Sequence, residues 1–223
     1  MSAVIASPDD RGQGYSDSLF ERMANDIRHS GYSVNPSALP EDLSHSLLAH
    51  LHGMRDAKFD DAGIGRARQH MLNQFVRSDA ICWIDGDSSA GAEWLRWTAR
   101  LQAHLNRSLL LGLFSFESHF AHYRPGDYYK RHLDAFKGQA NRVLSLVVYL
   151  NPTWQLDDGG ELVIYRDPSD TDGLRVTPGF GTVVAFLSEE FPHEVLPASR
   201  DRYSIAGWFR VNTSTAGHVD PPR

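Results

Sequence analysis

The first half of the chain carries apolar residues three and four residues apart in three segments. This spacing predicts amphipathic helices over 16–30, 41–54 and 90–107, each with one apolar face. Ser16 is a possible N-cap of the first helix, and Gly31 follows its last residue. The inward positions are Leu19, Phe20, Met23 and Ile27; Leu43, Leu47, Leu51 and Met54; and Trp94, Leu95, Thr98, Leu101 and Leu105.

After residue 112 the pattern changes to short runs rich in β-branched and aromatic residues, separated by Pro, Gly, Asn and Asp. Such runs predict β-strands. The eight candidates are "LFSFESHFAHY", "DYYKRHLD", "RVLSLVVYLN", "GELVIYR", "LRVTP", "TVVAFLS", "HEVLPA" and "RYSIAGWFRVN". We expect a further short strand at "AICWI", residues 80–84, after a polar segment at 58–75 that is interpreted as a mobile loop.

This order of elements predicts a mostly β fold with flanking helices. Regularly spaced short strands without intervening helices favour a double-stranded β-helix, the jelly-roll core of cupin-like proteins. The core is expected at 112–212 and the helical support at 16–107, which together form a single domain over 16–212. Residues 1–15 and the tail 213–223 are expected to be flexible.

Composition restricts the class of protein further. Apolar residues make up 41% and charged residues 22%, as in ordinary globular proteins, and the net charge of −6 disfavours a nucleic-acid-binding domain. The one cysteine, Cys82, is expected to be a small buried apolar residue. There is no basic leader and no apolar run of membrane-spanning length, so we expect a cytoplasmic protein that does not bind membranes.

The segment "YYKRHLDAF" contains a candidate metal site. A His-x-Asp spacing is expected about once by chance in a chain of this composition, and it occurs twice. His218 and Asp220 lie in the Gly/Pro-rich tail, where no strand would fix them. His132 and Asp134 fall in a predicted strand, whose period of two sends both side chains to one face. His193 is the best third ligand, and two imidazoles with one carboxylate favour non-haem Fe(II).

Two further residues suggest a second anion-binding point. Arg202 lies in the apolar strand "RYSIAGWF", where a buried guanidinium is costly unless an anion pairs with it. Its planar fork suits one end of a dicarboxylate whose other end is held by the metal. Tyr149 can add a hydroxyl to the same carboxylate, or it can be a core residue bonded to a backbone carbonyl.

These residues resemble the Fe(II)/2-oxoglutarate dioxygenases, and among them the prolyl hydroxylases of the hypoxia-sensing type. The family pattern is His-x-Asp, a distant His and a basic residue about ten positions later, which His132, Asp134, His193 and Arg202 match. The segments "VRSDAICWIDG", "VVYLN", "GGEL" and "PHEVLPA" also match in order. The resemblance spans roughly residues 76–212, about 60% of the chain.

The resemblance implies Fe(II), 2-oxoglutarate and O2 as cofactor and cosubstrates, with ascorbate as a further cofactor. It places Tyr149 and Arg202 at the distal carboxylate of 2-oxoglutarate and Tyr123 at the end nearest iron. It also implies that Trp208 and Tyr129 line the pocket, and that Arg142 contacts a peptide. Arg77 and Asp79 are either an ion-pair latch near the substrate, as the resemblance implies, or a surface pair of small energetic weight.

The implied reaction is hydroxylation of an exposed proline in a protein, with elongation factor Tu as the leading substrate by resemblance, and the enzyme is expected to be a monomer. Three alternatives remain open. One is hydroxylation of a free amino acid or small metabolite, a second is a non-catalytic cupin-type metal sensor, and a third is a nucleic-acid demethylase, which the charge disfavours. A zinc hydrolase using His50 and His52 is weaker, since residues two apart on a helix point to different faces.

Overall fold

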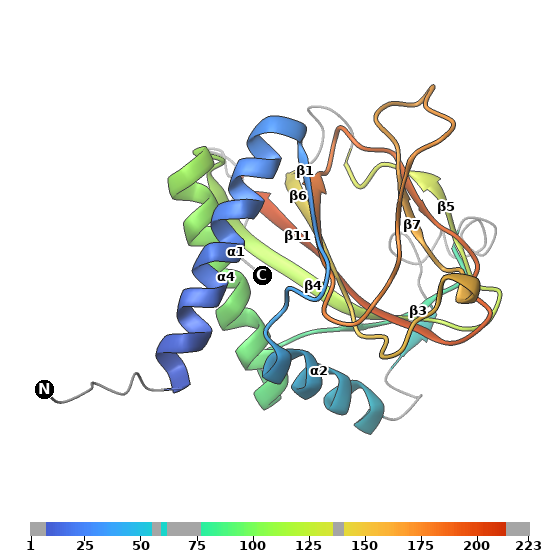
Figure 1. The fold of residues 1–223 in the computed structure, drawn as a ribbon, viewed down its shortest axis with the longest axis horizontal. Helices are drawn as coiled ribbons and strands as arrows, with labels where there is room; N and C mark the ends of the chain where they lie inside the picture. Colours follow the sequence, from blue (N-terminus) through green and yellow to red (C-terminus); the bar gives the residue numbers. More distant parts are fainter. Residues whose placement is uncertain (1–7, 55–58, 62–76, 136–140, 213–223) are drawn as a thin grey trace, which may run out of the picture.

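The computed structural model describes residues 8–54, 59–61, 77–135 and 141–212. In this part of the chain, two antiparallel sheets face each other, and helices cover the outer face of the larger sheet (Figure 1). This is the predicted mostly β architecture with flanking helices. The predicted flexible tail 213–223 and the second His-x-Asp pair, His218 and Asp220, lie outside the described residues.

The larger sheet has the strand order β1-β9-β6-β11-β4-β3-β2. Its long central strands are β11 and β4, which pair antiparallel along nearly their whole length. Only β1 and β2 were not predicted. The bounds are β1 (Tyr32–Asn35), β2 (Asp60–Asp61), β3 (Ala80–Trp83), β4 (Leu113–Tyr123), β6 (Arg142–Tyr149), β9 (Val183–Leu187) and β11 (Arg202–Val211).

The smaller sheet has the order β5-β10-β7-β8. Its strands are short, and loops link them to the larger sheet. Together the two sheets contain a strand in each of the eight segments predicted after residue 112. The bounds are β5 (Tyr129–His132), β7 (Leu162–Ile164), β8 (Leu174–Val176) and β10 (His193–Val195), with a 3-10 turn, η2, at Leu156–Asp158.

Three helices are described: α1 (Pro8–Ser30), α2 (Glu41–Gly53) and α4 (Ser89–Leu109). The predicted positions of α2 and α4 are confirmed, but α1 begins at Pro8 and not behind Ser16. A proline at the first helical position, followed by Asp9 and Asp10 in the first turn, suits a helix start. None of these helices combines the length and the apolar character that a membrane crossing requires.

Two separate cores hold these layers together. The first lies between the helices and the larger sheet and includes Trp94, Leu101, Phe120 and Phe209, which are nearly inaccessible to solvent. The second lies between the two sheets and includes Tyr123 and Tyr149, next to aliphatic residues such as Val184 and Ile164. Because polar aromatic side chains enter this second core, the space between the sheets is the place to look for a binding site.

Cys82 contributes to the helix side of β3. Its exposure is intermediate, and its Sγ lies 3.9 Å from Met54 Sδ. Cys82 is therefore less buried than predicted, because β3 lies next to the edge strand of its sheet.

Candidate active site

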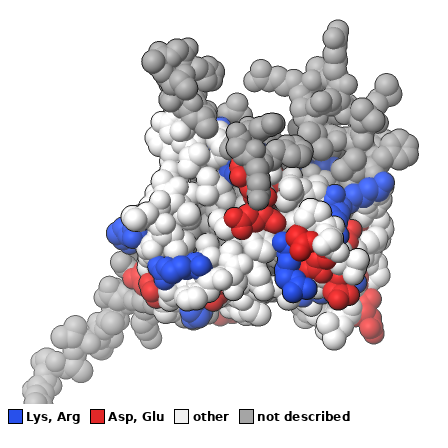
Figure 2. All heavy atoms as spheres, turned by 90° about the horizontal axis from the view of Figure 1, so that it is seen from above, with Lys and Arg blue, Asp and Glu red and all other residues white. Residues whose placement is uncertain are grey.

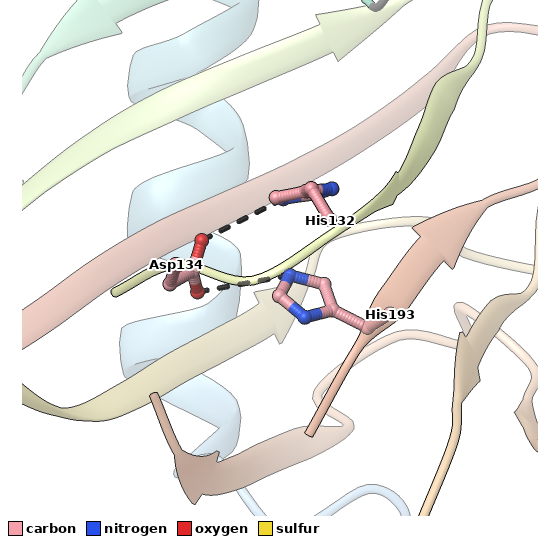
Figure 3. Close-up of side chains that lie close together, drawn as sticks. All are labelled: His132, Asp134 and His193. Carbon is pink, nitrogen blue, oxygen red and sulfur yellow. Dashed lines mark ion pairs between the residues drawn. The ribbon is translucent and has the colours of Figure 1, made fainter. Parts of the chain in front are cut away.

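Three predicted metal ligands come together at the edge of the smaller sheet. His132 ends β5, and His193 begins β10 directly opposite it in the strand register. Asp134 follows two residues after His132, and Figure 3 shows both imidazoles turned toward its carboxylate. His132 Nε2 lies 3.6 Å from Asp134 Oδ1, and His193 Nε2 lies 3.6 Å from Asp134 Oδ2. One ligand atom from each residue lies within 4.8 Å of the other two.

The strand itself is shorter than predicted. β5 ends at His132, so that Asp134 lies in a bend and not on the strand face with His132. The register between β10 and β5 shifts between His193 and Val195, and no paired residue follows His132. His132 and Asp134 lie close together, as predicted. The bend after β5, and not the alternation of a strand alone, turns Asp134 toward the imidazoles.

Backbone and side-chain partners orient these ligands. His132 Nδ1 lies 2.7 Å from Lys130 O, and His193 Nδ1 lies 3.0 Å from Phe191 O. A ring nitrogen next to a carbonyl carries the proton, so in each neutral imidazole the Nε2 lone pair is left for a metal. Ser145 Oγ donates to Asp134 Oδ2 at 2.6 Å and lies 2.9 Å from Ser188 Oγ.

The charges of the three groups also suit a divalent cation. Burial disfavours an ionised Asp134, but the two imidazoles and the Ser145 hydroxyl outweigh it and hold the pKa of Asp134 well below its ordinary value. Burial lowers the pKa of His193, although Asp134 opposes this. At neutral pH the group therefore contains an ionised carboxylate and a neutral His193, the forms that bind metal.

Replacing Ser145 by alanine is expected to weaken Fe(II) binding about 10- to 100-fold, because the Asp134 carboxylate loses the hydroxyl that orients it. The matched control is Ser33→Ala, since the buried Ser33 also donates to a carboxylate, Asp26 Oδ2 at 2.7 Å, but on β1. Isothermal titration under nitrogen gives both affinities. Equal Fe(II) affinities in the two variants would contradict this role for Ser145.

A cavity of about 600 Å³ extends from these ligands into the space between the sheets. Arg202 lies in its wall and is 1% exposed. Its Nε donates to Gly160 O at 2.9 Å, and no carboxylate of the described residues forms an ion pair with it. A buried guanidinium without a carboxylate partner is costly, so this end of the cavity suits an anion.

Two tyrosines flank the Arg202 guanidinium. Its Cζ lies 4.9 Å from the Tyr123 ring centroid and 5.0 Å from the Tyr149 ring centroid. The Tyr149 hydroxyl is buried and has no hydrogen-bond partner among the described residues. Burial raises the pKa of Tyr149 to about 12, although Arg202 acts in the opposite direction. The hydroxyl therefore stays protonated and can donate a hydrogen bond to a carboxylate. The alternative of a hydroxyl satisfied by a backbone carbonyl is not what the structure shows.

Arg77 and Asp79 form an ion pair that is not a surface pair. Arg77 Nε lies 2.7 Å from Asp79 Oδ1, and Asp79 is 1% exposed. The Arg77 guanidinium lies over the Tyr129 ring with 4.6 Å between Cζ and the centroid, and the Tyr129 ring stacks on His132 with centroids 3.6 Å apart. The ion pair therefore supports a metal ligand through one aromatic ring. The predicted loop beside it, 58–75, falls outside the described residues except for 59–61, which include β2.

Arg142 and Trp208 form another part of the cavity wall. The Arg142 guanidinium lies on the Trp208 ring with Cζ 3.7 Å from the centroid, and Glu117 Oε1 accepts from Arg142 Nη2 at 2.8 Å. Trp208 Nε1 is buried without a partner among the described residues. This indole N–H is available to a ligand in the cavity. Tyr123 and Tyr129 line the same cavity.

Three residues of the site were not predicted: Ser145, His119 and Trp83. His119 is 2% exposed, and burial, followed by the positive charge of Arg77, lowers its pKa to about 4. It is therefore a neutral imidazole in the cavity wall. The signal was present in the sequence, because His119, Ala121 and Tyr123 alternate with residues of the opposite face along β4.

The alternative metal residues do not assemble in the same way. His50 and His52 on α2 contact different rings, Phe120 and Tyr203. Among the described residues, only His132, Asp134 and His193 form a group of three or more His, Cys, Asp or Glu side chains with metal-binding spacing. On the face seen in Figure 2, acidic and basic side chains lie in small mixed groups, and the described part of that face has no broad basic patch for nucleic acid.

Comparison with known proteins agrees with this geometry. Residues 118–210, which contain all three candidate ligands and Arg202, match the model of the 2OG-Fe(II) oxygenase superfamily. A solved Pseudomonas putida prolyl-4-hydroxylase is 38% identical, with a TM-score of 0.76, and the alignment covers 86% of this chain and 98% of that one. The chain belongs to the 2OG-Fe(II) oxygenase superfamily.

Other relatives place it near the prolyl hydroxylases of this superfamily. A Trichoplax adhaerens prolyl hydroxylase, solved in complex with a hypoxia-inducible-factor peptide, is 25% identical with a TM-score of 0.77, over 92% of this chain and 94% of that one. A hypoxia-inducible factor prolyl hydroxylase of Caenorhabditis elegans is 28% identical over 60% of this chain. The chain spans only about a fifth of the length of that curated relative.

These findings confirm the predicted family, its jelly-roll fold and the enzyme class, a 2-oxoglutarate-dependent dioxygenase of the prolyl hydroxylase type. They also confirm the cofactor and cosubstrates, because this superfamily uses Fe(II) and 2-oxoglutarate with O2. The group of His132, Asp134 and His193 fits Fe(II) by its donors. The buried Arg202 guanidinium, which has no carboxylate partner among the described residues, and the Tyr149 hydroxyl fit a dicarboxylate.

Proposed function

We propose that this protein hydroxylates a proline residue exposed on another protein. Fe(II) would be held by His132, Asp134 and His193, and the distal carboxylate of 2-oxoglutarate by Arg202 and Tyr149. The observation that carries the proposal is that one cavity contains both a metal-binding group and a buried guanidinium without a carboxylate partner among the described residues. A simple metal-binding sensor needs the first feature and has no use for the second.

When bound, Fe(II) and 2-oxoglutarate activate O2 to replace a C–H bond of the proline ring by C–OH, while 2-oxoglutarate leaves as succinate and CO2. The residues of this chain bind and orient the reactants. The Arg202 fork offers two parallel N–H groups to a carboxylate, and the Tyr149 hydroxyl donates a further hydrogen bond. The Tyr123 hydroxyl lies in the same wall and is assigned to the end of 2-oxoglutarate nearest iron.

Residues farther along the same strands, away from Arg202 and Tyr149, are proposed to receive the proline. Trp208, Tyr129 and the Arg142 guanidinium offer flat apolar surface and hydrogen-bond donors, which suit a proline ring and its flanking carbonyls. The ion pair of Arg77 and Asp79 holds Tyr129 against His132, so it is assigned to positioning this part of the cavity. A protein substrate, and not a free amino acid, is favoured because a relative with the same fold was solved with a peptide bound.

Elongation factor Tu is the protein that we propose first as the substrate, from the likeness to bacterial prolyl hydroxylases. The test compares the purified protein before and after incubation with enzyme, Fe(II), 2-oxoglutarate and air. Peptide mass spectrometry should find one added oxygen atom on a single proline. The enzyme is also incubated with a cell extract under the same conditions. If elongation factor Tu stays unmodified while another protein of the extract is hydroxylated on proline, the proposed substrate is wrong but the proposed reaction stands.

A further inference from the structure

The imidazole of His119 lies in the wall of the active-site cavity and has no role in the reaction proposed above. His119 is on β4, and Ala121 and Tyr123 on the same face of that strand also line the cavity. The residue is 2% exposed, so an imidazole nitrogen without a hydrogen bond is costly here. A ligand in the cavity that bonds to this nitrogen would remove the cost.

A backbone carbonyl fixes the tautomer of His119. Nδ1 lies 3.2 Å from Phe120 O, and a carbonyl oxygen only accepts, so Nδ1 carries the proton. The ring is neutral, because burial and the positive charge of Arg77 lower its pKa to about 4. Nε2 is therefore a hydrogen-bond acceptor, and none of the described residues donates to it.

Aromatic neighbours hold the His119 ring on two sides. The Trp83 ring meets it edge to face, with centroids 5.2 Å apart, and the Trp208 ring lies 5.5 Å away. Directly opposite His119 in the register between β4 and β11 is Ala206, which lines the cavity and has only a methyl side chain. The imidazole is thus fixed in direction, and the strand beside it leaves space for a ligand.

Arg142, Trp208 and His119 follow one another along the strands of the cavity wall. Arg142 pairs with Arg210, two residues beyond Trp208 on β11. His119 pairs with Ala206, two residues before Trp208. Both side chains contact the Trp208 ring, with Arg142 Cζ 3.7 Å from its centroid. The wall therefore presents a cation, a flat aromatic ring and an acceptor in that order.

A trans peptide unit has groups that complement this order. It is planar, and its C=O and N–H point in opposite directions. Glu117 accepts from Nε and Nη2 of Arg142, which leaves Nη1 to donate to a carbonyl. His119 Nε2 can accept from the N–H at the other end of the unit. Proline has no N–H of its own, so the N–H next to its carbonyl belongs to the residue that follows it.

We infer that His119 accepts a hydrogen bond from the backbone N–H of the residue that follows the target proline, while Arg142 donates to the carbonyl of the proline. The inference rests on the proposed function, because it takes the proline to lie against Trp208. The substrate must then carry an N–H directly after the hydroxylated proline, so a second proline is disfavoured at that position. Free proline lacks this N–H as well.

The first test measures binding without hydroxylation. The protein is loaded with 2-oxoglutarate and with Zn(II) in place of Fe(II), and its histidines are ¹⁵N-labelled. The probes are N-acetyl-prolyl-glycine amide and its ester analogue, in which an oxygen replaces the glycine N–H. The amide is expected to shift the His119 Nε2 signal saturably and to bind about fivefold more tightly than the ester. No shift of this signal, or equal affinities of the two probes, would overturn the inference.

Three variants separate the hydrogen bond from other differences between the probes. His119→Leu removes the acceptor, and the preference for the amide should fall below about twofold. His119→Gln keeps an acceptor and should restore part of the preference. The control is His122→Leu, on the opposite face of β4 and outside the cavity lining, which should keep the full preference. A full preference in His119→Leu, or its loss in the control, would contradict the role of His119.

The second test uses hydroxylation. A peptide that spans the hydroxylated proline of the protein substrate is compared with the same peptide carrying the ester directly after that proline. The amide should have about fivefold higher kcat/KM in the unsubstituted enzyme and nearly equal kcat/KM in His119→Leu. Equal values in the unsubstituted enzyme would overturn the inference. If the enzyme hydroxylates no protein but still binds the amide probe in preference to the ester, the proposed function fails and the hydrogen bond of His119 stands.

Discussion

Replacing Arg202 by methionine is expected to weaken the binding of 2-oxoglutarate about 30-fold or more while leaving the protein folded. A buried carboxylate that loses its guanidinium partner costs about 2–5 kcal/mol, which is about 30-fold or more in affinity. Methionine fills similar volume without a charge. The measurement is the dissociation constant of 2-oxoglutarate for the metal-loaded variant, determined anaerobically.

Thermal unfolding of the protein without 2-oxoglutarate separates a binding role of Arg202 from a structural one. The guanidinium is 1% exposed and has no carboxylate partner among the described residues, so its removal relieves a desolvation cost. We expect the Arg202→Met protein to melt at or above the temperature of the unsubstituted protein. Arg202→Lys keeps the charge without the fork and should bind with intermediate affinity. A large loss of thermal stability in Arg202→Met would contradict this account.

Replacing Asp134 by alanine is expected to lower the affinity for Fe(II) at least about 100-fold and to stop hydroxylation. Asp134 is the one carboxylate of the metal group, and loss of an outer-shell partner alone commonly costs 10- to 100-fold. Without it, two imidazoles face each other across the site with no negative charge. Equilibrium dialysis against Fe(II) under nitrogen measures the loss.

Asp201→Ala is the matched control for Asp134→Ala. Asp201 also pairs with a histidine, with Asp201 Oδ1 2.7 Å from His122 Nε2, but neither residue lines the active-site cavity. Its replacement should leave Fe(II) affinity unchanged within about twofold, since exposed ion pairs contribute little. Loss of Fe(II) binding in both variants would show that the effect is one of folding and not of ligation.

Local patterns were sufficient to predict most of the fold. The eight strands after residue 112 and the helices α2 and α4 each carry their own periodicity, and the structure confirms them. β1 carries no such signal: Tyr32–Asn35 is only four residues long, and its pairing partner, Val183–Phe186, lies far along the chain. Non-local pairing of this kind is not visible in a single stretch of sequence.

The candidate site divides in a similar way. His132, Asp134, His193 and Arg202 were predictable because each is a polar residue at a definite spacing in an apolar setting. Ser145 was not, because its role arises from a contact with Asp134 that no local pattern shows. The burial of Asp79 was missed too, because its place just before the predicted strand 80–84 does not show which distant parts of the chain cover it.

The most direct test of the central assignment is an anaerobic titration of the Fe(II)-loaded protein with 2-oxoglutarate. Chelation of iron by the ketoacid end gives a weak visible charge-transfer band. The account predicts that this band saturates at one 2-oxoglutarate per iron in the unsubstituted protein, requires about 30-fold or more 2-oxoglutarate in Arg202→Met, and is absent in Asp134→Ala. A band of equal strength and affinity in all three proteins would contradict the assignment of both the metal group and Arg202.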